Sequence, residues 1–179
     1  MAGTPDAGTV TWLVLVYHLP PKSTALRLLV HRKLTAAGAV YLSRACAVAP
    51  PGPAERVMRR MRVTIADAGG SAVLFRAQPL LGGPEMAAEF NAARDREYDD
   101  IIASCRDAVA LIETMIAAGD LRYEQLSDAD AGLKQLDKRY GATAQHDVLA
   151  AAKAREAASA LASYRSALDE YGRCLDAAD

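Results

Sequence analysis

Apolar residues in the first half of the chain follow two patterns, one typical of buried strands and one of amphipathic helices. Residues 12–18 are apolar on both alternating faces, which predicts a strand buried on both sides. Beyond the Pro20-Pro21 stop, Ser23 is the expected cap of a helix. The apolar stripe of that helix is Leu26, Leu29, Val30, Leu34 and Ala37, and Gly38 ends it. The remaining segments are 39–49 (two short strands or one bent strand), a helix over 54–68 and a strand over 72–77.

The order strand, helix, strand, strand, helix, strand predicts a fold class. It is the βαββαβ arrangement of a ferredoxin-like α+β core, which we expect over residues 11–83. Both helices of such a core cover the same face of the sheet. Because the strands are apolar on both faces, the second face needs a cover from elsewhere in the chain.

The second half of the chain predicts only helices. A three-four spacing from Met86 to Met115 indicates a helix of roughly 34 residues, and two further helices are expected over 126–140, ended by Gly141, and over 158–175, with Tyr164 or Arg165 at its packed seam. Short connections favour an antiparallel arrangement. We expect residues 84–179 to form a helical section packed on the core, and residues 1–10 to be a disordered lead-in.

Charge is unevenly divided between the two halves. The chain holds 10 Lys and Arg against 3 Asp and Glu through Gly83, but 11 against 19 from Pro84 onward, so the formal charge of −1 hides a basic and an acidic part. Helical periodicity places Arg56, Arg59 and Arg60 on one face, opposite the apolar stripe. The other candidate contacts to DNA phosphates are Arg27, Arg32, Lys33 and Arg62. The alternatives are a solvated helix face and an internal seam with the acidic helices.

One polar ridge lies within the long helix. Spacings of three and four residues place Asn91, Arg94 and Glu97 or Tyr98 along one side. The ridge either anchors the helix through hydrogen bonds, which we favour, or forms a polar pocket.

Catalytic machinery is not evident in the sequence. Nuclease chemistry needs carboxylates near strand ends, but no Asp or Glu occurs between Asp6 and Glu55. No nucleophile, dinucleotide or phosphate-loop motif is present, and Cys46, Cys105 and Cys174 lack metal-ligand spacing, so each is expected to be a small buried hydrophobe. We therefore expect a non-enzymatic, cytoplasmic protein without cofactor, metal or membrane span.

Several segments resemble the N-terminal domain of the ChrB chromate-resistance regulators. The resemblance covers the chain from about residue 12 to its end, and the matching segments are Trp12–Pro21 (WLVLVYHLPP), Leu26-Arg27, Arg32–Leu34 (RKL), Gly38–Leu42 (GAVYL), Phe90–Arg94 (FNAAR), Glu97-Tyr98 and Leu121–Leu126 (LRYEQL). The chain departs from the family pattern at His31, because the resemblance predicts an aromatic residue at this position, Trp first. The family also resembles dimeric ferredoxin-like proteins, namely small CRISPR-associated nucleases and phenylacetate-type repressors.

The resemblance implies a repressor-like, DNA-binding transcriptional regulator that acts on the promoter of a chromate-resistance operon as a homodimer. Family members usually continue into a C-terminal domain implicated in the chromate response. We therefore expect a stand-alone N-terminal domain, with a separately encoded sensor domain as a candidate partner. The alternative function is a protein-interaction module that docks on such a partner without contacting DNA. Whether chromate binds this chain directly stays open.

Overall fold

The computed structural model describes residues 10–178, so the expected disordered lead-in lies outside the described residues except for Val10, which is buried. The elements are β1 (Trp12–His18), α1 (Thr24–Ala36), β2 (Val40–Ser43), β3 (Cys46–Ala49), α2 (Pro53–Asp67), β4 (Ser71–Ala77), α3 (Gly83–Ala118), α4 (Tyr123–His146) and α5 (Ala154–Ala178). They form two compact units. We call residues 1–93 with 145–150 the sheet unit, and residues 94–144 with 151–179 the helical unit.

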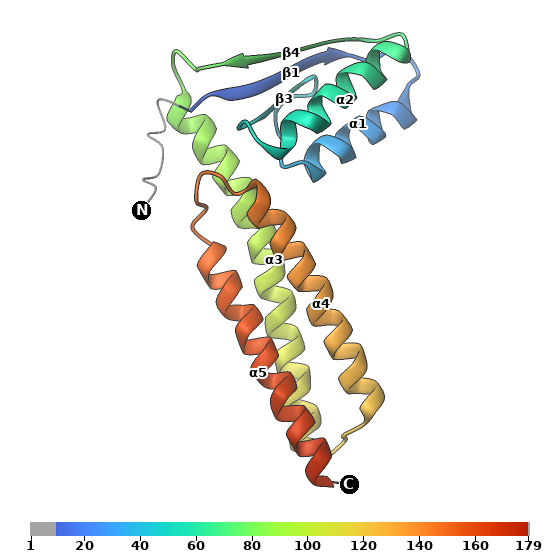
Figure 1. The fold of residues 1–179 in the computed structure, drawn as a ribbon, viewed down its shortest axis with the longest axis vertical. Coiled ribbons are helices and arrows are strands. Elements are labelled where there is room, and N and C mark those ends of the chain that lie inside the picture. Colours follow the sequence, from blue (N-terminus) through green and yellow to red (C-terminus); the bar gives the residue numbers. More distant parts are fainter. Residues whose placement is uncertain (1–9, 179) are drawn as a thin grey trace. The chain divides into compact units, whose positions relative to one another are not determined.

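The sheet unit has the predicted ferredoxin-like topology. Its four strands are ordered β2-β3-β1-β4 and all neighbours are antiparallel. The helices α1 and α2 lie side by side against the sheet (Figure 1). The segment 39–49 forms two strands joined by a tight turn at Arg44-Ala45, which was the first of the two predicted alternatives.

Alternate residues of β1 build the core beneath the helices. Leu13 and Leu15 are buried against Val30 of α1 and Met58 of α2. The predicted apolar stripe of α1 was wrong at Leu29, which is 41% exposed. The buried stripe of α1 is narrower than predicted, because Val30 and Leu34 already fill the space between this helix and the sheet.

The other face of the sheet has its own cluster. Trp12 is fully buried and meets the Phe90 ring edge to face, with centroids 5.7 Å apart, and Leu149 joins the same cluster. The start of α3 and residues near Leu149 therefore supply part of the cover that the two-sided strands required. Farther along this face, Val73 is 62% exposed and Phe75 44% exposed.

The turn after α2 explains why two glycines follow one another. Gly69 has φ +80°, a left-handed conformation that favours glycine at a helix end. At Gly70, a Cβ atom would lie 2.5 Å from the His18 carbonyl oxygen and 2.8 Å from the Ile65 side chain. The first glycine therefore supplies a backbone conformation, and the second allows close approach of α2 to β1.

The helical unit consists of the later part of α3 with α4 and α5, and α4 runs antiparallel to the other two helices (Figure 1). Its core includes Ile101, Leu133 and Tyr164, so Tyr164 rather than Arg165 occupies the seam of α5. The prediction that Gly141 ends the middle helix was wrong, because α4 continues to His146. Thr143 is buried on that extra turn, which gives the helix a packing contact beyond the glycine.

Candidate functional site: a basic helix surface and an adjoining pocket

All seven predicted DNA-contacting side chains lie on α1 and α2. The structure exposes every one of them, namely Arg27, Arg32, Lys33, Arg56, Arg59, Arg60 and Arg62. They lie in three places. Five residues on the outer sides of α1 and α2 form what we call the basic helix surface; these are Arg32, Lys33, Arg56, Arg59 and Arg60. Arg62 lines a hollow beside β4, and Arg27 lines a separate pocket.

Two helix features concentrate the positive charge. The helix α1 carries no Asp or Glu, and the acidic residues of α2 lie near its ends, Glu55 in the first turn and Asp67 at the last position. On α2, Met58 and Ile65 are buried against the sheet while Arg56 and Arg60 face solvent. The amphipathic pattern of the sequence thus produces an exposed row of guanidinium groups.

Glu55 neutralises part of this charge. Its Oε1 atom accepts hydrogen bonds from Arg59 at 2.7 Å and 3.1 Å, and its Oε2 atom accepts one from Arg76 at 2.8 Å. The bonds from Arg59 and then from Arg76 lower the pKa of the Glu55 carboxyl. These residues line the hollow beside β4, which has a volume of about 490 Å³ and also contains Arg62. The i,i+4 spacing signals the Arg59 pair in the sequence, but Arg76 is 21 residues away and only the fold reveals it.

The remaining cations of the predicted set have no such partner. Among the described residues, no ion pair involves Arg27, Arg32, Lys33, Arg56, Arg60 or Arg62. Unpaired guanidinium and ammonium groups keep their full charge and hydrogen-bond donors available to an anionic partner.

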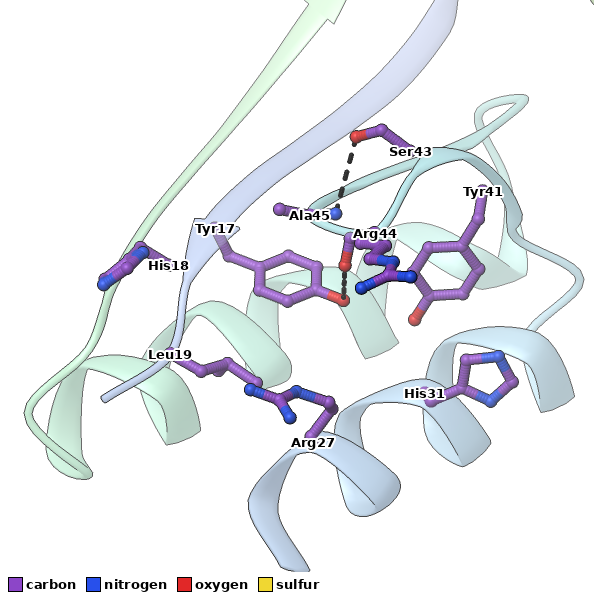
Figure 2. Close-up of a pocket in the computed structure, with 9 residues that line it drawn as sticks. All are labelled: Tyr17, His18, Leu19, Arg27, His31, Tyr41, Ser43, Arg44 and Ala45. Carbon is purple, nitrogen blue, oxygen red and sulfur yellow. Dashed lines mark hydrogen bonds between the residues drawn. The ribbon is translucent and has the colours of Figure 1, made fainter. Parts of the chain in front are cut away.

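A second hollow, which we call the Tyr41 pocket, lies between α1, the end of β1 and the β2–β3 turn (Figure 2). Its volume is about 670 Å³, and its lining residues are Tyr17, His18, Leu19, Arg27, His31, Tyr41, Ser43, Arg44 and Ala45. No carboxylate lines it. Figure 2 shows Arg27, Arg44, His31 and the two tyrosine hydroxyls around one opening, with the His18 side chain pointing away.

Aromatic packing holds this pocket together. The His31 ring stacks on Tyr41, with centroids 5.1 Å apart and an angle of 11° between the planes. The Tyr17 hydroxyl donates to the Arg44 carbonyl oxygen at 3.4 Å. His31 therefore occupies a stacking position, at the place where the family resemblance predicts an aromatic residue. The sequence reading did not single out the tyrosines, because the pocket is formed by three segments that only the fold brings together.

The Tyr41 hydroxyl is in an unusual environment. Burial raises its pKa far above the ordinary value, and the neighbouring Tyr17 hydroxyl raises it further. Its oxygen is buried and meets no hydrogen-bond partner among the described residues. The Tyr41 hydroxyl is therefore a buried polar group in the pocket wall, next to the Tyr17 hydroxyl.

The polar ridge of α3 forms hydrogen bonds in both units. Within the sheet unit, Asn91 donates to the Leu149 carbonyl oxygen at 3.4 Å. Within the helical unit, Arg94 is 1% exposed and donates to Glu97 at 2.7 Å, and Glu97 also accepts a bond from Thr143 of α4 at 3.0 Å. These contacts tie α3 to α4 and to the connection that follows α4.

Tyr98, the last ridge residue, is buried, and the centroid of its ring lies 5.7 Å from that of Tyr140. The tilted contact between the two rings adds a second link from α3 to α4 in the helical unit.

The cysteines and acidic residues show no metal-binding arrangement. Cys105 is buried and burial raises the pKa of its thiol, whereas Cys46 and Cys174 are only partly buried. In residues 10–178, no three His, Cys, Asp or Glu side chains are grouped so that they could hold a metal ion. None of the helices in that range has the length and apolar character needed to cross a membrane.

Comparison with known proteins gives a match to a protein family. The family model described as "Protein ChrB, N-terminal" matches residues 27–178, which is most of the chain and includes both helices of the basic helix surface. Neither the curated proteins nor the solved structures contain a significant match.

Proposed function

Since the chain belongs to the ChrB N-terminal family, a family associated with chromate resistance, we propose that it is a DNA-binding, repressor-like regulator of a chromate-resistance operon. It binds the promoter through the basic helix surface, acts in the cytoplasm and does so as a homodimer. The proposal includes no catalytic step.

The observation that carries this proposal is the unpaired state of the cations. Arg32, Arg56 and Arg60 are exposed on two adjacent helices and form no ion pair among the described residues. Duplex DNA carries a dense row of phosphates, and cations that replace its condensed counterions gain free energy from their release. Arginine adds bidentate hydrogen bonds to the phosphate oxygens.

The distribution of acids supports DNA over an internal acidic seam as the partner. Several acidic side chains of the helical unit pair with cations of the same unit, as Glu156 does with Arg106 and Lys153 at 3.0 Å and 2.8 Å. Asp137 pairs with Arg165 in the same way. Acids that already have a local partner gain less from a second cation, so they compete less well for the basic helix surface.

A second candidate function is a protein-interaction module that docks on a separate sensor domain without contacting DNA. It is favoured by the exposed apolar side chains Val73 and Phe75, which lie on the same face of β4. Such a module would bind its partner equally well when the arginines of α2 are removed.

Fluorescence anisotropy with a labelled promoter duplex tests the proposed function. We expect the full chain to bind this duplex more tightly than an unrelated one, and we expect the Arg56→Gln/Arg60→Gln variant to lose most of that affinity. A matched control, Arg106→Gln/Arg173→Gln, removes two exposed arginines that are ion-paired in the helical unit and should bind as the native chain does. Absence of binding at low salt, or equal binding by both variants, would overturn the proposal.

A further inference from the structure

We propose that the Tyr41 pocket binds a small tetrahedral oxyanion with two negative charges. This site is separate from the basic helix surface, and its existence does not depend on DNA binding.

The lining of the pocket determines the sign of the ligand. Arg27 and Arg44 both border it, no carboxylate does, and neither guanidinium forms an ion pair among the described residues. Two positive charges without a counter-charge favour an anion of matching charge. Guanidinium groups also present paired N–H donors that fit the oxygens of a tetrahedral oxyanion.

The Tyr41 hydroxyl supplies a neutral donor at the same opening. Its oxygen is buried without a hydrogen-bond partner among the described residues, while the neighbouring Tyr17 hydroxyl donates to the Arg44 carbonyl. A ligand oxygen that reaches this hydroxyl would recover the free energy that an unpaired buried hydroxyl costs. Figure 2 shows this hydroxyl on the same side of the opening as the Arg44 guanidinium.

The pocket walls are held in place before any ligand binds. The stacked His31 and Tyr41 rings connect α1 to β2. Ser43 accepts a hydrogen bond from the Ala45 amide at 3.4 Å, which closes the turn that carries Arg44. A preformed site loses less conformational entropy on binding than a flexible one.

A DNA phosphate is a less suitable occupant. The residues of the basic helix surface do not line this pocket, and Arg27 is the one predicted DNA-contacting residue that does. A backbone phosphate would have to enter a hollow bordered by the β2–β3 turn, whereas a free ion can diffuse into it.

Isothermal titration of the full chain with sulfate, phosphate and chromate, without DNA, tests this proposal. Chloride at matched ionic strength serves as the monovalent reference. We expect saturable one-site binding of at least one dianion and none of chloride. Arg44→Met should weaken binding by about tenfold, because it removes a charge-assisted contact. Tyr41→Phe should weaken it severalfold and keep the stacking contact.

Arg32→Met is the matched control, since it removes an exposed arginine of α1 that does not line the pocket. The control should bind the oxyanion as the native chain does. The proposal is overturned if no dianion binds saturably, or if Arg32→Met weakens binding as much as Arg44→Met. It is also overturned if Arg44→Met reduces only DNA affinity, which would assign Arg44 to the DNA surface. Loss of DNA binding by the Arg56→Gln/Arg60→Gln variant does not bear on this result.

Discussion

The sheet unit and the helical unit contain almost equal numbers of basic residues but use them differently. Among the described residues, ion pairs engage two of the ten Lys and Arg side chains in the sheet unit, and at least seven of the eleven in the helical unit. The supply of acids explains much of this contrast, because the chain has 3 Asp and Glu through Gly83 and 19 from Pro84 onward. The pairing also depends on whether an acid lies three or four residues away or is brought close by the fold.

The difference separates structural charges from available ones. In the helical unit, arginines join helices to one another or support their own helix, as Arg106 does with Glu156 of α5. In the sheet unit, Glu55 holds Arg59 and Arg76 and leaves Arg56 and Arg60 free. A region that keeps several unpaired cations on one surface can attract an anionic partner.

The largest effect should come from the ridge ion pair whose arginine is buried. Arg94 is only 2% exposed at its side chain and Glu97 is 38% exposed. Arg94→Met removes the buried guanidinium with its hydrogen bonds and leaves Glu97 without this partner, and we expect a loss of about 3 kcal/mol in the free energy of unfolding. The matched control is Arg173→Met, which breaks an i,i+3 pair whose arginine is 73% exposed, and should cost well under about 1 kcal/mol. Urea unfolding followed by circular dichroism measures both. Equal losses would mean that burial does not distinguish the two pairs.

A smaller effect is expected where α2 approaches β1. Gly70→Ala would place a Cβ atom against the His18 carbonyl, so backbone must move, and we expect a loss of about 2 kcal/mol. Thermal unfolding of the variant measures it. An unchanged midpoint would show that the turn can relax without cost.

Releasing the paired arginines should sharpen the contrast between the units. Glu55→Gln removes the carboxylate that holds Arg59 and Arg76, and we expect DNA affinity to rise by a few fold, with the salt dependence steeper by about one unit of slope. Anisotropy titrations over a range of salt concentrations provide the measurement. A fall in affinity would mean that the Glu55 pairs position the DNA contacts.

The smallest effect concerns the interior of α4. Gly141 lies within the helix and a Cβ atom there would meet nothing within 4 Å, so Gly141→Ala should stabilise the helical unit by about 0.5–1 kcal/mol. The same substitution at Gly70 has the opposite sign, because its surroundings are filled. Parallel urea titrations of the two variants compare them directly. A destabilised Gly141→Ala would show that the helix needs the glycine there.

Local patterns were enough to predict most of the fold. The two-sided apolar run of β1, the stripes of α1 and α2 and the glycine stops predicted the βαββαβ order and the approximate bounds of its elements. The helices α4 and α5 extend at both ends beyond the predicted ranges 126–140 and 158–175. The prediction was wrong at Leu29, which was assigned to the buried stripe but is exposed. It was also wrong at Gly141, where α4 continues through a residue of low helix propensity. In both cases tertiary packing outweighed the local signal.

Only part of the candidate site could be predicted from the sequence. Periodicity found the exposed faces that carry Arg56 and Arg60, since residue spacing alone fixes a helix face. It could not find the pairing of Arg76 with Glu55, or the grouping of Tyr41 with Arg44 and Arg27, because those contacts join distant segments. The basic helix surface was therefore predictable, and the Tyr41 pocket was not.

The salt dependence of promoter binding tests most directly whether the unpaired cations contact DNA. The slope of the logarithm of the association constant against the logarithm of salt concentration should be steep for the native chain and smaller by about two units for Arg56→Gln/Arg60→Gln. The slope for Arg106→Gln/Arg173→Gln should equal that of the native chain, because both of its arginines are ion-paired within the helical unit. The same slope in all three proteins, or a reduced slope in the helical-unit variant alone, would contradict the account.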